Sequence, residues 1–172
     1  MLNKLEKKDY PEYFEKYVEL ITDSDIVHAL KQQLEQTSAL FKGLTEDQLL
    51  HRYAEGKWAV KEVFGHIMDH ERLLSYWLYR FARGDMTPLS GGDRELSVQN
   101  ARYIERSAAS LIEEYAAVRQ STIQLLQGLP EEAWSRNGYA GDQVMSVQAL
   151  AFIIAGHEKY HINMIEERYL KL

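Results

Sequence analysis

Two histidines lie four residues apart near the end of this 172-residue chain, His157 and His161. On an α-helix this spacing places the side chains about 40° apart around the axis and roughly 6 Å apart along it, so that both imidazoles can reach one metal ion. The same helical face carries Leu150 and Ile154, and we expect it to point into the protein interior. Because inward-facing imidazoles need a partner and a metal ion is a good one, the pattern predicts a metal site.

An earlier segment contains a second pair with the same spacing, His66 and His70. Either residue can supply a third ligand beside His157 and His161, and the spacing alone does not choose between them. Three histidines from two helices leave coordination positions open for water or substrate, as is typical of catalytic metal sites.

The segment from His157 to His161 also has the form His-Glu-x-x-His, the zinc-peptidase motif, in which the glutamate is the general base. That class takes its third ligand from a separate segment, whereas the candidates downstream here, Glu166 and Glu167, fall on the same helix. A di-iron carboxylate bundle needs Glu-x-x-His on two helices, and the second histidine pair lacks it. Both alternatives are therefore disfavoured.

Two carboxylates adjoin the candidate ligands in the sequence, Glu158 and Asp69. Each can orient a ligand imidazole or transfer a proton during a reaction. The other charged side chains around Asp69 are expected to form a solvated helix flank with ion pairs. They are Glu71, Arg72, Arg80 and Arg83.

The composition excludes several classes of chemistry. The chain has no cysteine, so disulfides, thiolate nucleophiles, cysteine zinc ribbons and cysteine-ligated iron–sulfur clusters are excluded. A net charge of −6 argues against a broad nucleic-acid surface. Met1–Tyr10 does not have the form of a secretory signal, and the apolar run Ala149–Ala155 is far shorter than the ~20 residues of a membrane span. We expect a cytoplasmic protein without nucleic-acid or membrane partners.

Hydrophobic periodicity predicts the elements that must position these residues. Apolar residues recur at helical spacing in four segments, at about residues 25–41, 59–82, 98–127 and 147–170. Ser24 or Asp25 can cap the first helix, and Gly43 can end it. Residues 1–24 form an N-terminal extension with a short helix near Tyr13–Leu20, Thr87–Arg94 is a loop, and no segment shows the alternation of a strand. The sequence predicts one all-α domain, 1–172, folded as a four-helix bundle.

A weak internal repeat relates the two halves of the chain. His70-Glu71 matches His157-Glu158 at an offset of 87, and a Gly-Leu pair recurs at Gly43 and Gly128. This repeat places His70 opposite His157 and therefore favours His70 as the third ligand.

The ordered motifs resemble the DinB-like superfamily, which includes YfiT-like metal-dependent hydrolases and bacillithiol transferases. The resemblance rests on Trp58-x-x-x-Glu62, on Gly65-His66 and on the terminal His157-x-x-x-His161. It implies an up-down-down-up four-helix bundle, often a homodimer. It also implies a divalent metal ion held by His66, His157 and His161, which leaves His70 as the rival third ligand.

The resemblance also implies an activity. We expect a Zn²⁺- or Ni²⁺-dependent transferase that acts on a small-molecule substrate with a low-molecular-weight thiol, or a hydrolase. The lack of cysteine is compatible with a thiol that arrives as a small molecule. The alternative from a different class is a non-catalytic, dimeric metal- or ligand-binding module in stress response.

Overall fold

The computed structural model describes residues 5–170, and its elements are mostly helical. The helices and strands are α1 (Glu15–Val18), α2 (Ile26–Gly43), α3 (Glu46–Leu50), α4 (Val60–Ala82), α5 (Arg94–Ala101), α6 (Ala108–Gln127), β1 (Asn137–Ala140), β2 (Gln143–Ser146) and α7 (Val147–Met164). Short 3₁₀ segments cover Lys7–Asp9, Glu12–Phe14, Tyr103–Glu105 and Glu131–Ala133, and a π-helical segment, Ile165–Tyr169, extends α7. None of the helices in the described part of the chain has both the length and the apolarity to cross a membrane.

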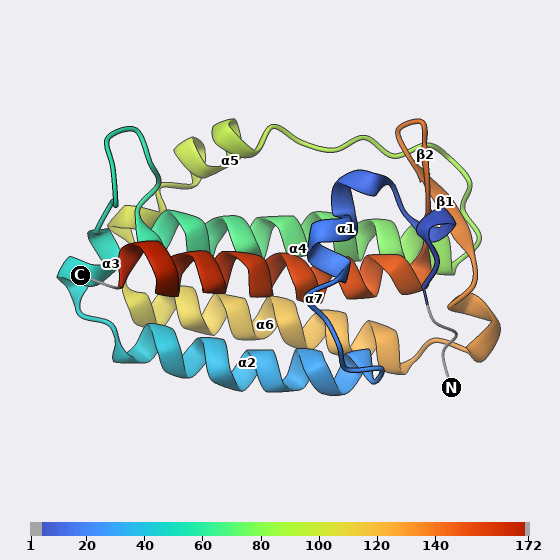
Figure 1. Ribbon diagram of the computed structural model, residues 1–172, viewed down its shortest axis with the longest axis horizontal. Coiled ribbons are helices and arrows are strands. Elements are labelled where there is room, and N and C mark those ends of the chain that lie inside the picture. The colour runs from blue at the N-terminus through green and yellow to red at the C-terminus, as the bar shows by residue number, and fades with distance from the viewer. Residues whose placement is uncertain (1–4, 171–172) are drawn as a thin grey trace.

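The four long helices α2, α4, α6 and α7 form the predicted bundle in up-down-down-up order (Figure 1). The neighbours α4 and α6 run in the same direction, so residues 83–107 must return along the length of the bundle to connect them. Side chains of Asp25, Ser107 and Ser146 cap the first turns of α2, α6 and α7 by accepting backbone N–H groups. These caps satisfy donors that the helices cannot satisfy internally.

The predicted helix over residues 98–127 is wrong at its N-terminal end. Residues 94–101 form a separate helix, α5, and α6 begins only at Ala108. Between them Arg102 adopts a left-handed conformation with φ 53°, which ends α5, and Ser107 then starts α6. The side chains in α5 are mostly polar, so its helical period carries little information about where it ends.

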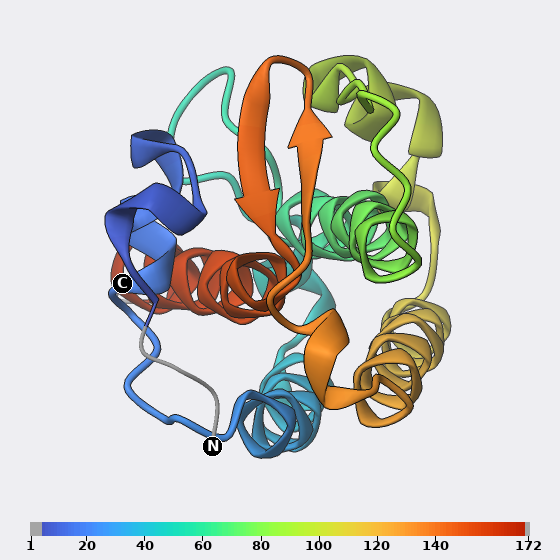
Figure 2. The ribbon, with the colours of Figure 1, turned by 90° about the vertical axis from the view of Figure 1, so that its right-hand side faces the viewer.

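The prediction of no strands is also wrong, because β1 and β2 form a short antiparallel hairpin with Gly138 opposite Met145. The hairpin stands at one end of the bundle beside α4 and α7, as the end-on view in Figure 2 shows. A Cβ atom at Gly138 would overlap the ring of Phe81 on α4, so the strand packs directly against that helix. Each strand has four residues, too few for alternation to be recognised in the sequence.

The bundle interior divides into two apolar clusters with a polar layer between them. The cluster near the hairpin includes Leu30, Leu78 and Leu150, and the cluster at the opposite end includes Phe64 and Ile165. Between these clusters every long helix contributes buried polar side chains instead of aliphatic ones. They are Thr37, His66, Glu71, Arg119, His157 and Glu158.

Candidate metal centre

Three of the predicted ligands, His66 on α4 with His157 and His161 on α7, come together in this polar layer. One ring nitrogen from each lies within 4.8 Å of the others. The Nε2 atoms of His66 and His157 are 3.2 Å apart. Two nitrogens that each bind a tetrahedral zinc ion at about 2.0–2.1 Å lie roughly 3.3 Å apart, so this pair already has the spacing that zinc requires.

His70 lies one turn further along α4 and outside that group of nitrogens. Its ring packs against the ring of His157 in a tilted arrangement, with a centroid distance of 4.0 Å and an interplanar angle of 33°. Its Nε2 atom is buried and has no hydrogen-bond partner among the described residues. The structure therefore brings His70 beside the cluster of three, in ring contact with His157 but outside the group of converging nitrogens.

The cluster is held in its neutral form. Burial, together with the smaller effects of the neighbouring His161 and Arg94, lowers the pKa of His66 to about 3. Burial and the other histidines lower the pKa of His157 well below its ordinary value, and burial and His70 lower that of His161 to about 4. A metal ion binds the neutral imidazole, so the cluster is ready to bind a cation at neutral pH.

The three imidazole nitrogens, at the spacing described above, fit a divalent transition metal ion. Three imidazole nitrogens suit Zn²⁺ or Ni²⁺. The buried Nδ1 atom of His161 has no hydrogen-bond partner among the residues described, so that ring is not committed to another contact. The three ligand positions come from two rigid helices, and no fourth protein group is in the cluster of the described residues. Such a site keeps at least one coordination position for a small molecule.

The short helix α1 covers the cluster on one side (Figure 1). The ring of Tyr17 packs edge-on against that of His157, with a centroid distance of 5.3 Å. This approach requires Gly156, because a Cβ atom there would overlap the backbone carbonyl of Tyr17. The position of α1 confirms the expected short helix in the N-terminal extension, although it spans only four residues.

A cavity of about 230 Å³ adjoins the cluster on another side. His66 and His70 line it from α4, and residues from the start of α5 complete it. The cluster is therefore covered by α1 but is next to a space large enough for a small organic molecule.

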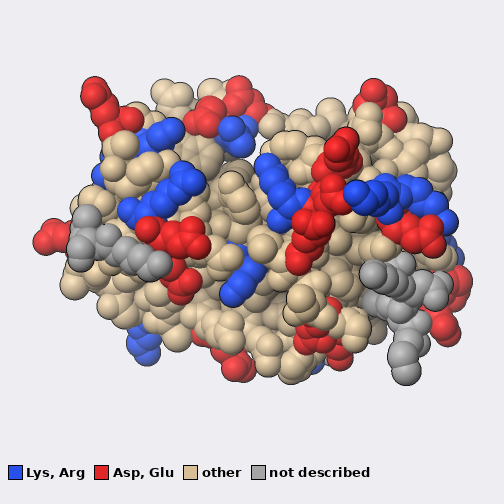
Figure 3. Space-filling model, viewed as in Figure 1, with Lys and Arg blue, Asp and Glu red and all other residues tan. Residues whose placement is uncertain are grey.

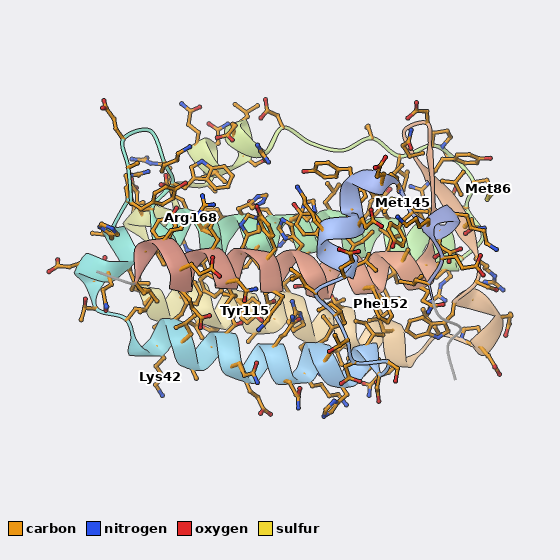
Figure 4. All side chains as sticks on the ribbon, in the orientation of Figure 1. Lys42, Met86, Tyr115, Met145, Phe152 and Arg168 are labelled. Carbon is orange, nitrogen blue, oxygen red and sulfur yellow. The ribbon has the colours of Figure 1, made fainter. Side chains whose placement is uncertain are left out.

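The expectation that Glu71 is solvated is wrong. Its side chain is buried and accepts hydrogen bonds from Nε and Nη2 of Arg119 on α6, at 2.9 and 2.8 Å. The same guanidinium binds Glu158, whose carboxylate also accepts hydrogen bonds from Tyr115 at 2.9 Å and Thr37 at 2.7 Å. Figure 4 shows Tyr115 between α6 and α7. Burial opposes the charge on Arg119, but the carboxylates of Glu158 and Glu71 raise its pKa well above the ordinary value.

The two predicted carboxylates have different surroundings. Glu158 is fully engaged in the buried network that contains Arg119. Asp69 is half-buried and lines the cavity beside His66. Its two oxygens accept hydrogen bonds from Arg72 at 3.2 Å and from the hydroxyl of Tyr103 at 2.7 Å.

Sequence reasoning missed Arg119 and Tyr115 as parts of this centre. The signal was present, because Arg119 lies four residues after Tyr115 and four before Ile123, within the apolar stripe of α6. A charged residue at a stripe position needs a buried partner, and Glu71 holds the equivalent position on α4, between Ile67 and Leu74.

Comparison with known proteins gives one family and several similar structures, of which three are described here. The family model of the DinB superfamily matches residues 29–165. YfiT from Bacillus subtilis, described as a probable metal-dependent hydrolase with an unusual four-helix bundle topology, has a TM-score of 0.72 at 16% identity. The match covers 96% of this chain and 90% of YfiT.

The second similar structure is the mycothiol-dependent maleylpyruvate isomerase, with a TM-score of 0.67 at 11% identity over 84% of this chain and 60% of that chain. The third is YjoA, a DinB-like protein of Bacillus subtilis, with a TM-score of 0.61 at 17% identity over 83% and 87%. No curated protein sequence matches the chain. At these identities the structural matches show a shared fold.

Proposed function

This chain belongs to the DinB superfamily, and from that premise we propose that it is a metal-dependent enzyme acting on a small molecule at its three-histidine cluster. The observation that carries the proposal is the convergence of one nitrogen each from His66, His157 and His161 within 4.8 Å. A catalytic metal site requires neutral imidazoles, a free coordination position and an adjoining cavity. A structural metal site does not need this combination.

The reaction we propose is transfer of a low-molecular-weight thiol to an electrophile, and the second candidate is hydrolysis. A bound divalent ion would lower the pKa of a coordinated thiol or water and so supply a nucleophile at neutral pH. The mycothiol dependence of one similar structure supports the thiol, and the description of YfiT supports hydrolysis. The chain has no cysteine, so a reactive sulfur would belong to the small molecule.

The protein's own residues would position the reactants and exclude water. Tyr17 on α1 packs against His157 and shields that side of the cluster. Asp69 faces the cavity and is the carboxylate to which we assign proton transfer. Glu158, bound by Arg119 and Tyr115, would act by fixing the part of α7 that carries His157.

The test uses protein purified without a histidine tag. Metal analysis is followed by assays of thiol consumption with an electrophile and of ester hydrolysis, each with Zn²⁺, with Ni²⁺ and after chelation. We expect about one metal ion per chain and metal-dependent turnover in one assay, both lost in the double variant His157→Ala/His161→Ala. If the wild-type protein contains no more metal than the double variant, the proposal is overturned. Metal binding without turnover in either assay would instead assign a binding module.

A further inference from the structure

A positively charged side chain, to which the proposed function assigns no role, lines the cavity beside the histidines. Arg94, the first residue of α5, is 65% exposed and lines this space of about 230 Å³ together with His66 and His70. At about 30 Å³ per water molecule, the cavity holds roughly eight waters or a small organic molecule of comparable volume.

The guanidinium of Arg94 is free to bind an anion. It donates no hydrogen bond within the described residues, and its ion pair there is with Glu95 through Nε at the long distance of 3.4 Å. Glu95 is in turn held by the indole N–H of Trp58. The two terminal nitrogens of an arginine form a planar fork that matches a carboxylate bidentately.

The other charged group in the lining does not compete for this fork. Asp69 accepts hydrogen bonds from Arg72 and Tyr103, so its charge is already compensated. Of the charged side chains in the lining, Arg94 is therefore the one whose charge is available to an anionic ligand.

A second polar group lies next to the same space. The buried Nε2 atom of His70 has no partner among the described residues and belongs to a ring that lines the cavity. Buried polar atoms are nearly always satisfied, so an unpaired one beside a cavity points to a ligand or water that pairs with it.

We propose that this cavity is the subsite for a small carboxylate-bearing reactant, with its carboxylate on Arg94 and its polar middle on Nε2 of His70. This inference rests on the proposed function, because the reactive end of the ligand would then lie at the three-histidine cluster. The carboxylate belongs either to the electrophile or to the thiol, and the chemistry that recognises it is the same.

The experiment compares two pairs of probes that differ in charge but hardly in size. Succinate is paired with succinamide, and 3-mercaptopropionate with 3-mercaptopropionamide, and binding to the zinc-loaded protein is measured by calorimetry. We expect the acid to bind at least about tenfold more tightly than its amide in one pair, as for a charged hydrogen bond, and the preference to disappear in Arg94→Gln. The matched control is Arg83→Gln, an exposed arginine after the end of α4, which should keep the preference.

The pair that shows the preference identifies the source of the carboxylate. A preference in the thiol-free pair assigns it to the electrophile, and a preference only in the thiol pair assigns it to the thiol. Equal binding of acid and amide in both pairs, or a preference that survives in Arg94→Gln, overturns the subsite.

Failure of the proposed function can be recognised separately. If the protein binds no zinc, the metal-free protein is titrated with succinate and succinamide while backbone amide shifts are followed by NMR. Succinate-specific shifts at residues 91–98 that vanish in Arg94→Gln would support the subsite even without the metal. Their absence would overturn it.

Discussion

Glu71 and Glu158 accept hydrogen bonds from one guanidinium, that of Arg119, at the centre of the bundle. Glu158 directly follows His157 of the three-histidine cluster, and Glu71 directly follows His70, whose ring contacts His157. The shared arginine therefore fixes the relative positions of the two helices at the level where their histidines meet. Two carboxylates and one guanidinium give this buried group a formal charge of −1, and a divalent cation nearby would oppose it.

Replacing Arg119 should be far more damaging than replacing a surface arginine. In Arg119→Met two carboxylates lose a buried partner, and we expect the free energy of unfolding to fall by about 3–5 kcal/mol. Arg72→Met is the matched control, because Arg72 is 43% exposed in its pairs with Asp69 and Glu114 and should cost at most about 1 kcal/mol. Urea denaturation followed by circular dichroism measures both. Equal losses would show that the network contributes no more than a surface pair.

The two histidines of α4 should differ in their effect on metal binding. We expect His66→Ala to lose bound zinc, because His66 belongs to the group of converging nitrogens. His70→Ala should retain zinc with an affinity within about tenfold of the wild type, since His70 only contacts a ligand ring. Competition with a zinc chelator measures both affinities. Loss of zinc in His70→Ala alone would reverse the assignment.

The metal-free protein should lose stability as the pH falls from about 6.5 to 4.5. The pKa values of His66 and His70 are lowered to about 3, whereas the unfolded chain binds their protons near pH 6.5. The unfolded state therefore binds more protons in this range, and stability rises with pH by up to about 1.4 kcal/mol per pH unit for each such histidine. This contribution is fully present above pH 6.5.

The variant His70→Leu tests the contribution of one of these histidines to the pH dependence of stability. Its unfolding free energy should depend less steeply on pH between 6.5 and 4.5 than that of the wild type, and thermal melts across this range measure the difference. An unchanged slope would mean that His70 is protonated in the folded protein at these pH values.

The contact between α1 and α7 should depend on Gly156. In Gly156→Ala the new methyl group overlaps the carbonyl of Tyr17, so we expect α1 to move off α7 at a cost of about 1–3 kcal/mol. Hydrogen exchange in residues 15–18 should then be faster. Gly43→Ala is the control, since a Cβ atom there meets nothing within 4 Å. Unchanged exchange in Gly156→Ala would show that α1 is not fixed by this contact.

The sequence predicted the long helices and the converging histidines because both follow from the helical period. Residues spaced three or four apart share a face whatever the partner helix is, so His157 and His161 were recognisable as a pair. The choice between His66 and His70 depends on how α4 is rotated against α7, which no local pattern contains. The family resemblance favoured His66 and the internal repeat favoured His70, and in the structure His66 is the residue that joins the cluster.

The missed features depend on contacts between distant segments. Glu71 and Arg119 are 48 residues apart, and each alone looks like a surface charge on an amphipathic helix. The break in the helix at Arg102 and the hairpin of β1 and β2 likewise depend on packing against α4. The hydrophobic pattern of the local sequence does not indicate either of them. On the face shown in Figure 3, acidic and basic side chains intermix.

The parallel course of α4 and α6 has a consequence for how proteins of this shape can diversify. Each of these helices is roughly 30 Å long, at 1.5 Å per residue, so the connection between them must span the whole bundle and cannot be a tight turn. In this chain that obligatory crossover, residues 83–107, carries Arg94 to the rim of the metal centre. The topology thus supplies a long surface segment whose sequence can vary between proteins of this shape while the helices that hold the histidines are unchanged. Such variation would alter which reactant the cavity accepts.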